Sequence, residues 1–349
     1  MKKKYLLIIA VFMLIVTGCN AKEPNVMDSP YKRTEFMMGT IVTLKIYDEG
    51  KEDVVDAAFS EMEKLARQIG VEETHSQIDQ INDAAGDSPV EVSDAIFSLI
   101  QAGKNYSEQA EGSFDITIGP LTSLWHIGYE DAKKPTQEEI DTVLPLINYQ
   151  KVVLNEAEQT VFLKEKGMQI DLGAIAKGFI ADQVTELLDD NNVTTAIIDL
   201  GGNIYVKGNN PKGSEWTVGI QDPFTERGKI VGKLHASNQS IVTSGIYERY
   251  LEVDGERYHH ILNPIDGYPY KNKIAGVTII SEKSMDGDAL STLIFSKGLK
   301  EGLSYIEKQE GVEAIFVDKD RQIFITSGLD NEFELTNEAF KLGNREDIQ

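Results

Sequence analysis

Cysteine is nearly absent from this chain of 349 residues, and so are several common nucleotide and metal motifs. The single cysteine, Cys19, has no second cysteine with which to form a disulfide inside the chain. Because there is no Cys-x-x-Cys pair, a thiolate metal site and a redox pair are excluded. A G-x-x-x-x-G-K-S/T loop is also missing, and the Gly201-Gly202 pair is not part of a G-x-G-x-x-G turn. These absences argue against the Walker and Rossmann types of nucleotide site.

Basic residues are scarce as well. The 34 lysines and arginines stand against 57 aspartates and glutamates, which gives a net charge of −23 at pH 7. Such a chain would repel nucleic-acid phosphates, and general adhesion to an anionic lipid surface is disfavoured for the same reason. The length is sufficient for one large domain or two modest ones with a substantial core. A nucleic-acid-binding protein is therefore not expected.

The chain opens on an apolar run that is short for a membrane span. Lysines at positions 2–4 precede it, and Val16-Thr17-Gly18-Cys19 resembles a lipobox. A plain secretory signal or a short membrane helix is the alternative, but the only cysteine directly after Gly18 favours acylation, for example by palmitate. We expect a lipoprotein signal peptide at 1–18, a lipidated tether at 19–32 and one domain at 33–345. The protein would then sit at the extracytoplasmic face of the cell membrane, held by the lipid anchor alone.

Apolar periodicity predicts a fold that mixes helices and strands, of the α+β class. Helices are expected at about 52–69, 92–110 and 284–295, and a short one is expected before 147. Strands are expected at 41–47, 196–206, 216–220, 230–236, 240–244, 247–253 and 275–280, with hairpins at 152–163 and 313–326. The run 112–121 is strand-like and ends at Gly-Pro, and the Gly-Gly pair inside 196–206 suggests a bulge or a close backbone contact.

The stretch Asp171 to Phe179 is unusual for a helix start. We expect a strand at 167–170 to turn directly into a helix from Ala174, with Asp171 at the N-cap and Gly173 allowing a close backbone approach. Lys177 would lie in the first turn, where its charge opposes the helix dipole. An anion held between Lys177 and the free N–H groups would reverse the sign of that effect. The alternative is a solvated lysine on an ordinary amphipathic helix.

Two further carboxylates have both a structural and a functional interpretation. Asp115 lies in the strand-like run, where a buried carboxylate more often accepts backbone hydrogen bonds than serves a ligand. Asp288 and Thr292 are four residues apart on a predicted helix, so their oxygens share one face and suit Mg²⁺. A helix-start acid with a back-bonded threonine is the commoner explanation of such a pair.

Six short motifs occur together and in a fixed order. They are Met38-Gly39-Thr40, Phe114 to Leu121, Asp171 to Gly178, Asp199 to Asn203, His260 to Pro264, and Asp288 to Thr292. Together they resemble the ApbE family of FAD:protein FMN transferases, in family order from about residue 36 to 300. The resemblance implies a two-lobed, T-fold-like domain with mixed or antiparallel sheets and flanking helices. FAD and Mg²⁺ would lie between the lobes.

The resemblance also implies the reaction. A Mg²⁺-dependent enzyme of this family transfers FMN from FAD, its substrate, to a threonine or serine hydroxyl of an exported flavoprotein. A phosphoester bond forms and AMP is released. The acceptor motif, Asp-x-x-Ser/Thr-Gly-Ala-Ser/Thr, is absent from this chain, so the expected partner is a separate acceptor protein.

The family's site residues can be assigned by motif. The residues implied to hold FAD are Met38, Ser113, Phe114, Asp115, Asp171, Lys177 and the backbone around Leu262. The residues implied to hold the metal are Ala174, through its main-chain carbonyl, with Asp288 and Thr292. One site would then account for the unusual lysine, the paired oxygens and the helix start.

Attack on a diphosphate places negative charge on its oxygens, for which Mg²⁺, Lys177 and a helix N-terminus are suitable partners. The incoming hydroxyl needs a base, and His260 is the candidate. Alternatively, His260 positions the diphosphate or its own loop. His259 is the weaker candidate of the two.

One departure from the family pattern concerns the flavin ring. Many relatives have a tyrosine beside the isoalloxazine, where this chain has Val71-Glu72-Glu73-Thr74-His75-Ser76. Family members without that tyrosine can resemble FAD hydrolases, which make FMN and AMP with water as acceptor. An FAD diphosphatase is therefore one alternative, and a lipoprotein that binds flavin without catalysis is another. The latter would not need a metal on the diphosphate.

Overall fold

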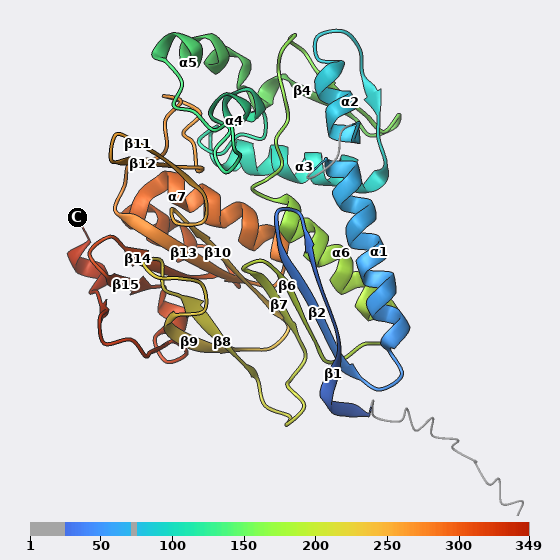
Figure 1. Cartoon of the computed structure of the whole chain (residues 1–349), viewed down its shortest axis with the longest axis vertical. Coiled ribbons are helices and arrows are strands. Elements are labelled where there is room, and N and C mark those ends of the chain that lie inside the picture. Colours follow the sequence, from blue (N-terminus) through green and yellow to red (C-terminus); the bar gives the residue numbers. More distant parts are fainter. Residues whose placement is uncertain (1–24, 71–74, 349) are drawn as a thin grey trace, which may run out of the picture.

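The computed structural model describes residues 25–70 and 75–348 (Figure 1). The expected signal peptide, the lipidation site Cys19 and the position of the missing tyrosine, 71–74, lie outside these residues. A nine-stranded sheet forms the centre. In pairing order its strands are β1 (Val26–Met37), β2 (Thr40–Asp48), β6 (Ala196–Leu200), β7 (Asn203–Lys207), β10 (Gln239–Gly245), β13 (Ile274–Ser281), β14 (Glu313–Asp318), β15 (Gln322–Ile325) and β17 (Lys341–Leu342).

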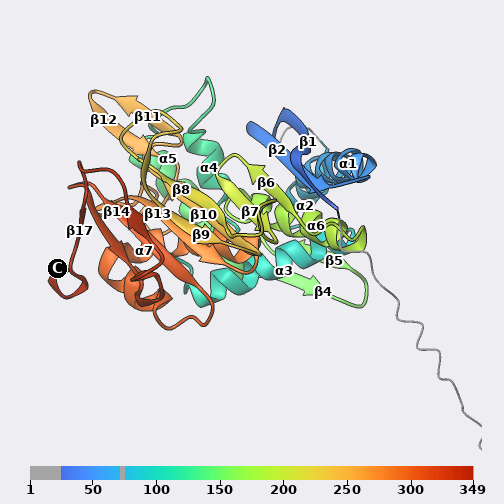
Figure 2. The ribbon, with the colours of Figure 1, turned by 90° about the horizontal axis from the view of Figure 1, so that it is seen from below.

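Helices cover one face of this sheet, and a smaller sheet covers the other (Figures 1 and 2). The covering helices are α1 (Glu52–Ile69), α6 (Ala176–Asp190) and α7 (Ser284–Ile306). The smaller sheet consists of β8 (Trp216–Gln221), β9 (Ile230–Ala236) and β16 (Glu334–Leu335). Alternate residues of a strand therefore enter different cores: Ile279 of β13 packs toward the helices and Ile280 toward β8 and β9.

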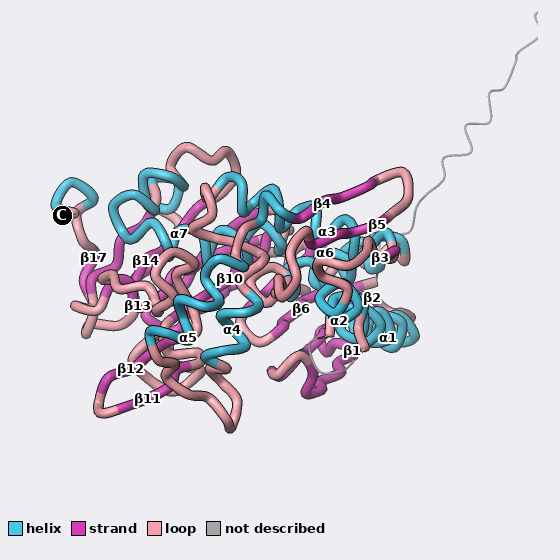
Figure 3. Tube along the Cα trace, turned by 90° about the horizontal axis from the view of Figure 1, so that it is seen from above, coloured by secondary structure: helices cyan, strands magenta, loops and turns pink. Residues whose placement is uncertain are grey.

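A second lobe is inserted between α1 and α6. It contains α2 (Gln77–Asp83), β3 (Val90–Glu91), α3 (Asp94–Gln109), α4 (Gly119–Trp125), α5 (Gln137–Val143), β4 (Val152–Asn155) and β5 (Thr160–Leu163). Its apolar cluster around Leu121 and Trp125 also includes Tyr258 and Leu262, which lie in and just after the hairpin of β11 (Tyr250–Val253) and β12 (Glu256–His259). Figure 3 shows this hairpin beside α4 and α5. The two lobes thus share segments, as expected for an α+β fold with flanking helices.

Several elements agree with the prediction. The helix at 52–69 has the expected bounds, and Gly70 ends it in a left-handed conformation with φ 81°. The hairpins β4–β5 and β14–β15 are present. All strand pairs of the central sheet are antiparallel except β15 with β17, so the sheet is mixed.

Other expectations were wrong. The run 112–121 is not a strand: Pro120 lies in the first turn of helix α4, a position that needs no N–H. Residues 167–170 make only an isolated bridge between Gln169 and Ile118. Gly201 and Gly202, with φ of 71° and 106°, form the turn of the β6–β7 hairpin and not a bulge, but the alternative of a close contact is confirmed, because a Cβ atom on Gly201 would collide with the Thr40 side chain. Residues 26–32, which were expected to belong to the tether, are part of strand β1, which begins at Val26.

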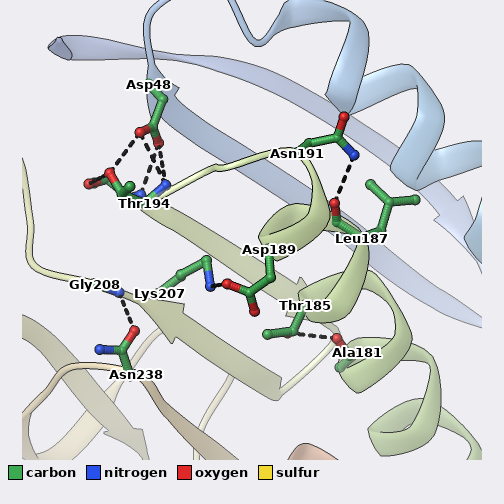
Figure 4. Close-up of polar contacts among 11 residues, drawn as sticks. Asp48, Ala181, Thr185, Leu187, Asp189, Asn191, Thr194, Lys207, Gly208 and Asn238 are labelled. Atoms are coloured by element: carbon green, nitrogen blue, oxygen red, sulfur yellow. Dashed lines mark hydrogen bonds and ion pairs between the residues drawn. The ribbon is translucent and has the colours of Figure 1, made fainter. Parts of the chain in front are cut away.

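The C-terminal end of α6 is fastened to the central sheet, as Figure 4 shows. Lys207 Nζ of β7 lies 2.5 Å from Asp189 Oδ1 on the last turn of α6. Asp48 at the end of β2 accepts hydrogen bonds from the backbone N–H of Thr194 and of Thr195 and from the Thr194 hydroxyl, at 2.7–3.1 Å. These bonds fix the direction of α6 and hence the place of its N-terminus.

Several chain reversals meet at one end of the central sheet. The β1–β2 turn at Met38-Gly39 and the β6–β7 turn lie there, together with the end of β10. Met38 and Gly39 both have positive φ, 54° and 67°, which is typical of a two-residue hairpin turn. No helix within 25–70 and 75–348 is long and apolar enough to cross a membrane.

Gly178 determines how closely α6 and α7 approach. A Cβ atom on Gly178 would stand 2.4 Å from the Ser284 carbonyl oxygen and 2.5 Å from Met285 Cα, which are backbone atoms that cannot turn aside. We expect Gly178→Ala to lower the free energy of unfolding by about 1–3 kcal/mol, because α7 must shift. Urea unfolding of both proteins measures this difference.

The matched control is Gly276→Ala. Gly276 is also buried, but a Cβ atom there would meet its nearest neighbours at 3.7 Å, an ordinary contact. This control should unfold at nearly the native urea concentration. Equal losses in the two variants would contradict the special role assigned to Gly178.

Candidate active site

The motif Asp171 to Gly178 does not form the expected strand-to-helix junction. Helix α6 begins at Ala176, after a turn in which the Leu172 carbonyl accepts the N–H groups of Ile175 and Ala176. Asp171 is therefore not the N-cap. Its carboxylate accepts hydrogen bonds from the Gly173 N–H at 2.8 Å and from the Thr122 hydroxyl at 2.7 Å. No side chain within the motif caps the helix start.

The partner of that helix start comes from α7. Asp288 Oδ2 accepts the N–H of Gly178 at 2.9 Å. In return, Asp182 of α6 accepts the N–H groups of Ser284 and Met285, the first two residues of α7, at 2.7 and 3.0 Å. Each helix thus supplies the carboxylate for the N-terminal end of the other, where orphan N–H groups and the positive end of the dipole favour a negative charge.

Asp288 is 4% exposed, and its burial raises the pKa of the carboxyl above its ordinary value. The charge of Lys177 and the N–H groups of Gly178 and Lys177 oppose that rise. Burial also raises the pKa of Asp182, to about 6, and the nearby charge of Asp286 adds to the rise. Two acidic groups are therefore held in a region that disfavours their charged forms unless a cation is close.

The oxygen atoms implied as metal ligands gather at this helix pair. Thr292 follows Asp288 by one helical turn, and its hydroxyl has no hydrogen-bond partner within 25–70 and 75–348. Ala174 lies two residues before the first residue of α6. A carboxylate, a hydroxyl and a main-chain carbonyl form a hard-oxygen set that fits Mg²⁺, which keeps several water or phosphate ligands. The described part of the chain contains no cluster of three His, Cys, Asp or Glu residues.

The two neighbouring histidines differ in their surroundings. His259 is buried: its Nε2 bonds the Tyr270 carbonyl at 3.0 Å and its Nδ1 accepts the Ile261 N–H at 3.3 Å. Both ring nitrogens are thus used by the backbone. His260 is half-buried, and its Nδ1–H donates to the Arg249 carbonyl at 3.1 Å. That bond leaves Nε2 of His260 as an acceptor.

Burial lowers the pKa of His260 to about 4, and the positive charges of Arg249 and Lys177 contribute. Lys177 therefore acts on His260 as well as on Asp288. The structure brings together three predicted site residues, Lys177, His260 and Asp288, from α6, the segment after β12, and α7. His259 has its pKa lowered to about 4 by burial, which suits a neutral structural histidine.

The segment Ser113 to Asp115 packs against the same helix. The Ser113 hydroxyl lies 2.9 Å from that of Ser296, one turn beyond Thr292 on α7. Asp115 is buried, and it accepts hydrogen bonds from the Thr117 N–H, the Thr117 hydroxyl and the Tyr149 N–H, at 2.7–3.0 Å. The structural interpretation of Asp115 is thereby confirmed. Its contact with FAD, like that of the buried Phe114, stays a prediction.

Met38 and Leu262 lie on two other elements, the β1–β2 turn and the segment that follows His260. Met38 is buried although its backbone has a positive φ, a conformation that costs about 1–3 kcal/mol and persists where the surroundings impose it. Leu262 follows His260 by two residues and pairs with Pro269 in an isolated bridge. A cavity of about 700 Å³ beside His259 is lined by residues 221, 223–227, 246–248, 250, 257, 259 and 319, and it is separate from the assigned site, because Lys177, His260 and Asp288 do not line it.

Sequence reasoning missed Asp182 and Arg249. Asp182 lies on a helix and its partner is 102 residues away, so no local pattern reveals the contact. Arg249 lies inside the strand predicted at 247–253, where an arginine is unremarkable. Its closeness to His260 follows only from the folded chain.

Comparison with known proteins agrees with this geometry. A family profile described as "ApbE family" matches residues 38–316. The chain is 41% identical over 297 residues to an FAD:protein FMN transferase of Klebsiella pneumoniae (strain 342), covering 85% of this chain and 92% of that protein. It is 31% identical over 351 residues to an FAD:protein FMN transferase of Treponema pallidum (strain Nichols), covering 96% and 97%.

Solved structures share the fold. The crystal structure of the ApbE protein from Thermotoga maritima superimposes with a TM-score of 0.79 at 29% identity, over 86% of this chain and 98% of that one. The flavinyl transferase ApbE from Pseudomonas stutzeri, in its apo form, gives 0.76 at 27% identity, over 88% and 97%. Because profile, sequence relatives and solved structures agree over most of its length, the chain belongs to the ApbE family.

Proposed function

We propose that this protein is an FAD:protein FMN transferase, which moves FMN from FAD to the hydroxyl of a threonine or serine in a partner protein and releases AMP. The observation that carries the proposal is that the charge of Lys177, in the first turn of α6, acts on both His260 and Asp288, and that Asp288 accepts the Gly178 N–H of the same helix start. The high identity to relatives named for this activity supports it. Those names also argue against flavin binding without catalysis.

The residues have distinct roles in this reaction. Lys177 and the N-terminal N–H groups of α6 neutralise the charge that develops on the diphosphate oxygens. Asp288, Thr292 and the Ala174 carbonyl would hold Mg²⁺, which when bound supplies further charge stabilisation at the phosphate. Met38, Ser113, Phe114, Asp115, Asp171 and the backbone at Leu262 would orient FAD.

His260 accepts the proton of the attacking hydroxyl. Its Nδ1–H is held by the Arg249 carbonyl, so Nε2 carries the lone pair. Because the pKa of His260 is about 4, the imidazole is neutral at pH 7 before substrate binds. A bound diphosphate raises that pKa, since a negative charge favours the imidazolium form. The base thus becomes stronger when FAD is present.

A second candidate function is FAD hydrolysis to FMN and AMP. The specific observation in its favour is the stretch Val71-Glu72-Glu73-Thr74, which lacks the tyrosine of many relatives. In that case water takes the place of the protein hydroxyl at the same site. The acceptor proposed for transfer is an exported flavoprotein with an Asp-x-x-Ser/Thr-Gly-Ala-Ser/Thr segment. A lipid on Cys19 would hold this chain at the outer face of the cell membrane, where it would encounter that acceptor.

The first test incubates the chain from Lys22 onward with FAD and Mg²⁺, with and without an exported domain that carries the acceptor motif. AMP release and flavin fluorescence on a denaturing gel are followed together. Covalent flavin on the acceptor is the expected result. AMP without covalent flavin would assign the diphosphatase instead, and no AMP in either tube would refute both activities.

Asp288→Asn tests the metal site proposed at Ala174, Asp288 and Thr292. The asparagine oxygen still accepts the Gly178 N–H, but the charge that attracts a divalent cation is lost. We expect AMP release to fall on the order of 100-fold or more, as for the loss of several kcal/mol of charge stabilisation. The matched control is Asp286→Asn, two residues earlier on α7, whose carboxylate accepts the Tyr106 hydroxyl at 2.6 Å. Near-native rates in both variants would count against the metal site.

The pH profile of AMP release tests His260. Since the neutral imidazole is the active form and its pKa is about 4, kcat/KM should fall as the pH drops through about 4, not through the ordinary value of 6.5. The corresponding fall in kcat should occur at higher pH, because bound FAD raises the pKa of His260. His260→Gln should abolish the fall in rate that is due to protonation of the imidazole. Any fall in rate that is due to protonation of Asp288 should remain. An unchanged profile in this variant would leave His260 with a positioning role only.

A further inference from the structure

Arg249 differs from every other arginine of the chain. The sequence contains seven, and all seven lie within the described residues. Six have an acidic or aromatic partner: Arg33, Arg67, Arg227, Arg257 and Arg345 form ion pairs, and Arg321 lies over the rings of Phe224 and Phe340. Arg249 has neither an ion pair nor a ring contact in 25–70 and 75–348. Arg249 is exposed, so its guanidinium is open to a ligand from solvent.

The side chain of Arg249 occupies a space that two glycines leave open. A Cβ atom on Gly39 would stand 3.2 Å from Arg249 Nη2, and one on Gly128 would stand 2.9 Å from Arg249 Cδ. Both glycines have positive φ, 67° and 102°. The arginine therefore runs between the β1–β2 turn and the loop after α4, and its guanidinium lies at the turn that contains Met38 and Gly39.

Arg249 lies next to His260, the proposed base. The Arg249 carbonyl accepts both the N–H and the Nδ1–H of His260, at 3.2 and 3.1 Å. The guanidinium and the ammonium of Lys177 act on the same imidazole from different elements, with His259 as the third neighbouring titratable group. Arg249 and Lys177 thus both place positive charge near His260, where the proposed function puts the diphosphate of FAD.

We propose that Arg249 binds the diphosphate of FAD as a second cation beside Lys177, an inference that rests on the proposed function. A guanidinium presents a planar fork of N–H donors that matches two phosphate oxygens, whereas an ammonium acts as a point charge. Arg249 would fix the orientation of the diphosphate, and Lys177 would neutralise its developing charge. The open space around Gly39 and Gly128 allows the fork to reach its ligand.

The test compares three variants of the full-length protein: Arg249→Gln, Arg249→Lys and Arg257→Gln. Arg257 is the matched control, because it lies in the adjacent β11–β12 hairpin and pairs with Glu252 at 3.2 Å. FAD and ADP are titrated by calorimetry without divalent metal, so that binding is measured apart from turnover. Thermal unfolding midpoints report whether each variant is folded, and AMP release and FMN transfer are then measured with Mg²⁺.

We expect Arg249→Gln to weaken the binding of both FAD and ADP by about 10-fold or more, the usual effect of losing a charge-assisted hydrogen bond. Arg249→Lys should recover part of this affinity, and Arg257→Gln should bind like the native protein. The unfolding midpoints should stay within a few degrees of the native value.

Three results would overturn the inference. Native affinity for FAD and ADP in Arg249→Gln would mean a solvated side chain. Native affinity and AMP release with reduced FMN transfer would assign the guanidinium to the acceptor protein. An equal loss in the glutamine and lysine variants with a lowered unfolding midpoint would mean a structural role. If the native protein neither binds FAD nor releases AMP, the proposed function itself fails, and the inference with it.

Discussion

The site depends on two helices, each of which supplies a carboxylate to the N-terminal end of the other. Asp288 of α7 accepts an N–H at the start of α6, and Asp182 of α6 accepts the first two N–H groups of α7. Each helix satisfies donors that the other cannot satisfy for itself. Gly178 makes this arrangement geometrically feasible, because a side chain there would collide with the backbone of α7. The relative position of Lys177, Asp288 and Thr292 follows from this one helix pair.

Local charge at the site runs against the charge of the whole molecule. The chain carries −23, yet the charges of Lys177 and Arg249 both act on His260, in the region where we propose that the diphosphate binds. At distances beyond about 10 Å, salt screens these groups, and the acidic surface does not attract an anionic ligand. Binding must therefore come from direct contacts of the ligand with residues of the site.

The predictions from the sequence were most accurate where a single local rule determines the structure. The helix at 52–69 was predicted from its apolar spacing, and the structure shows that its acidic first turn and Gly70 agree with that spacing. The run 112–121 was wrong because its apolar residues pack into a loop and a short helix, whose partners lie elsewhere in the chain. In the site, short motifs identified Lys177, His260 and Asp288, but not Asp182 or Arg249. Their roles arise from contacts across 102 and 11 residues that no spacing rule describes.

The link between Gly178 and Asp288 joins residues 110 positions apart. Such a contact requires both α6 and α7, and the loop of chain between them must be closed at a cost in entropy. A nascent chain that has made α6 but not yet α7 holds Lys177 in place without its carboxylate partner. It therefore has no complete site for a diphosphate. Activity on a small, abundant metabolite would begin only once the last third of the protein is folded, so that incomplete chains leave the metabolite untouched.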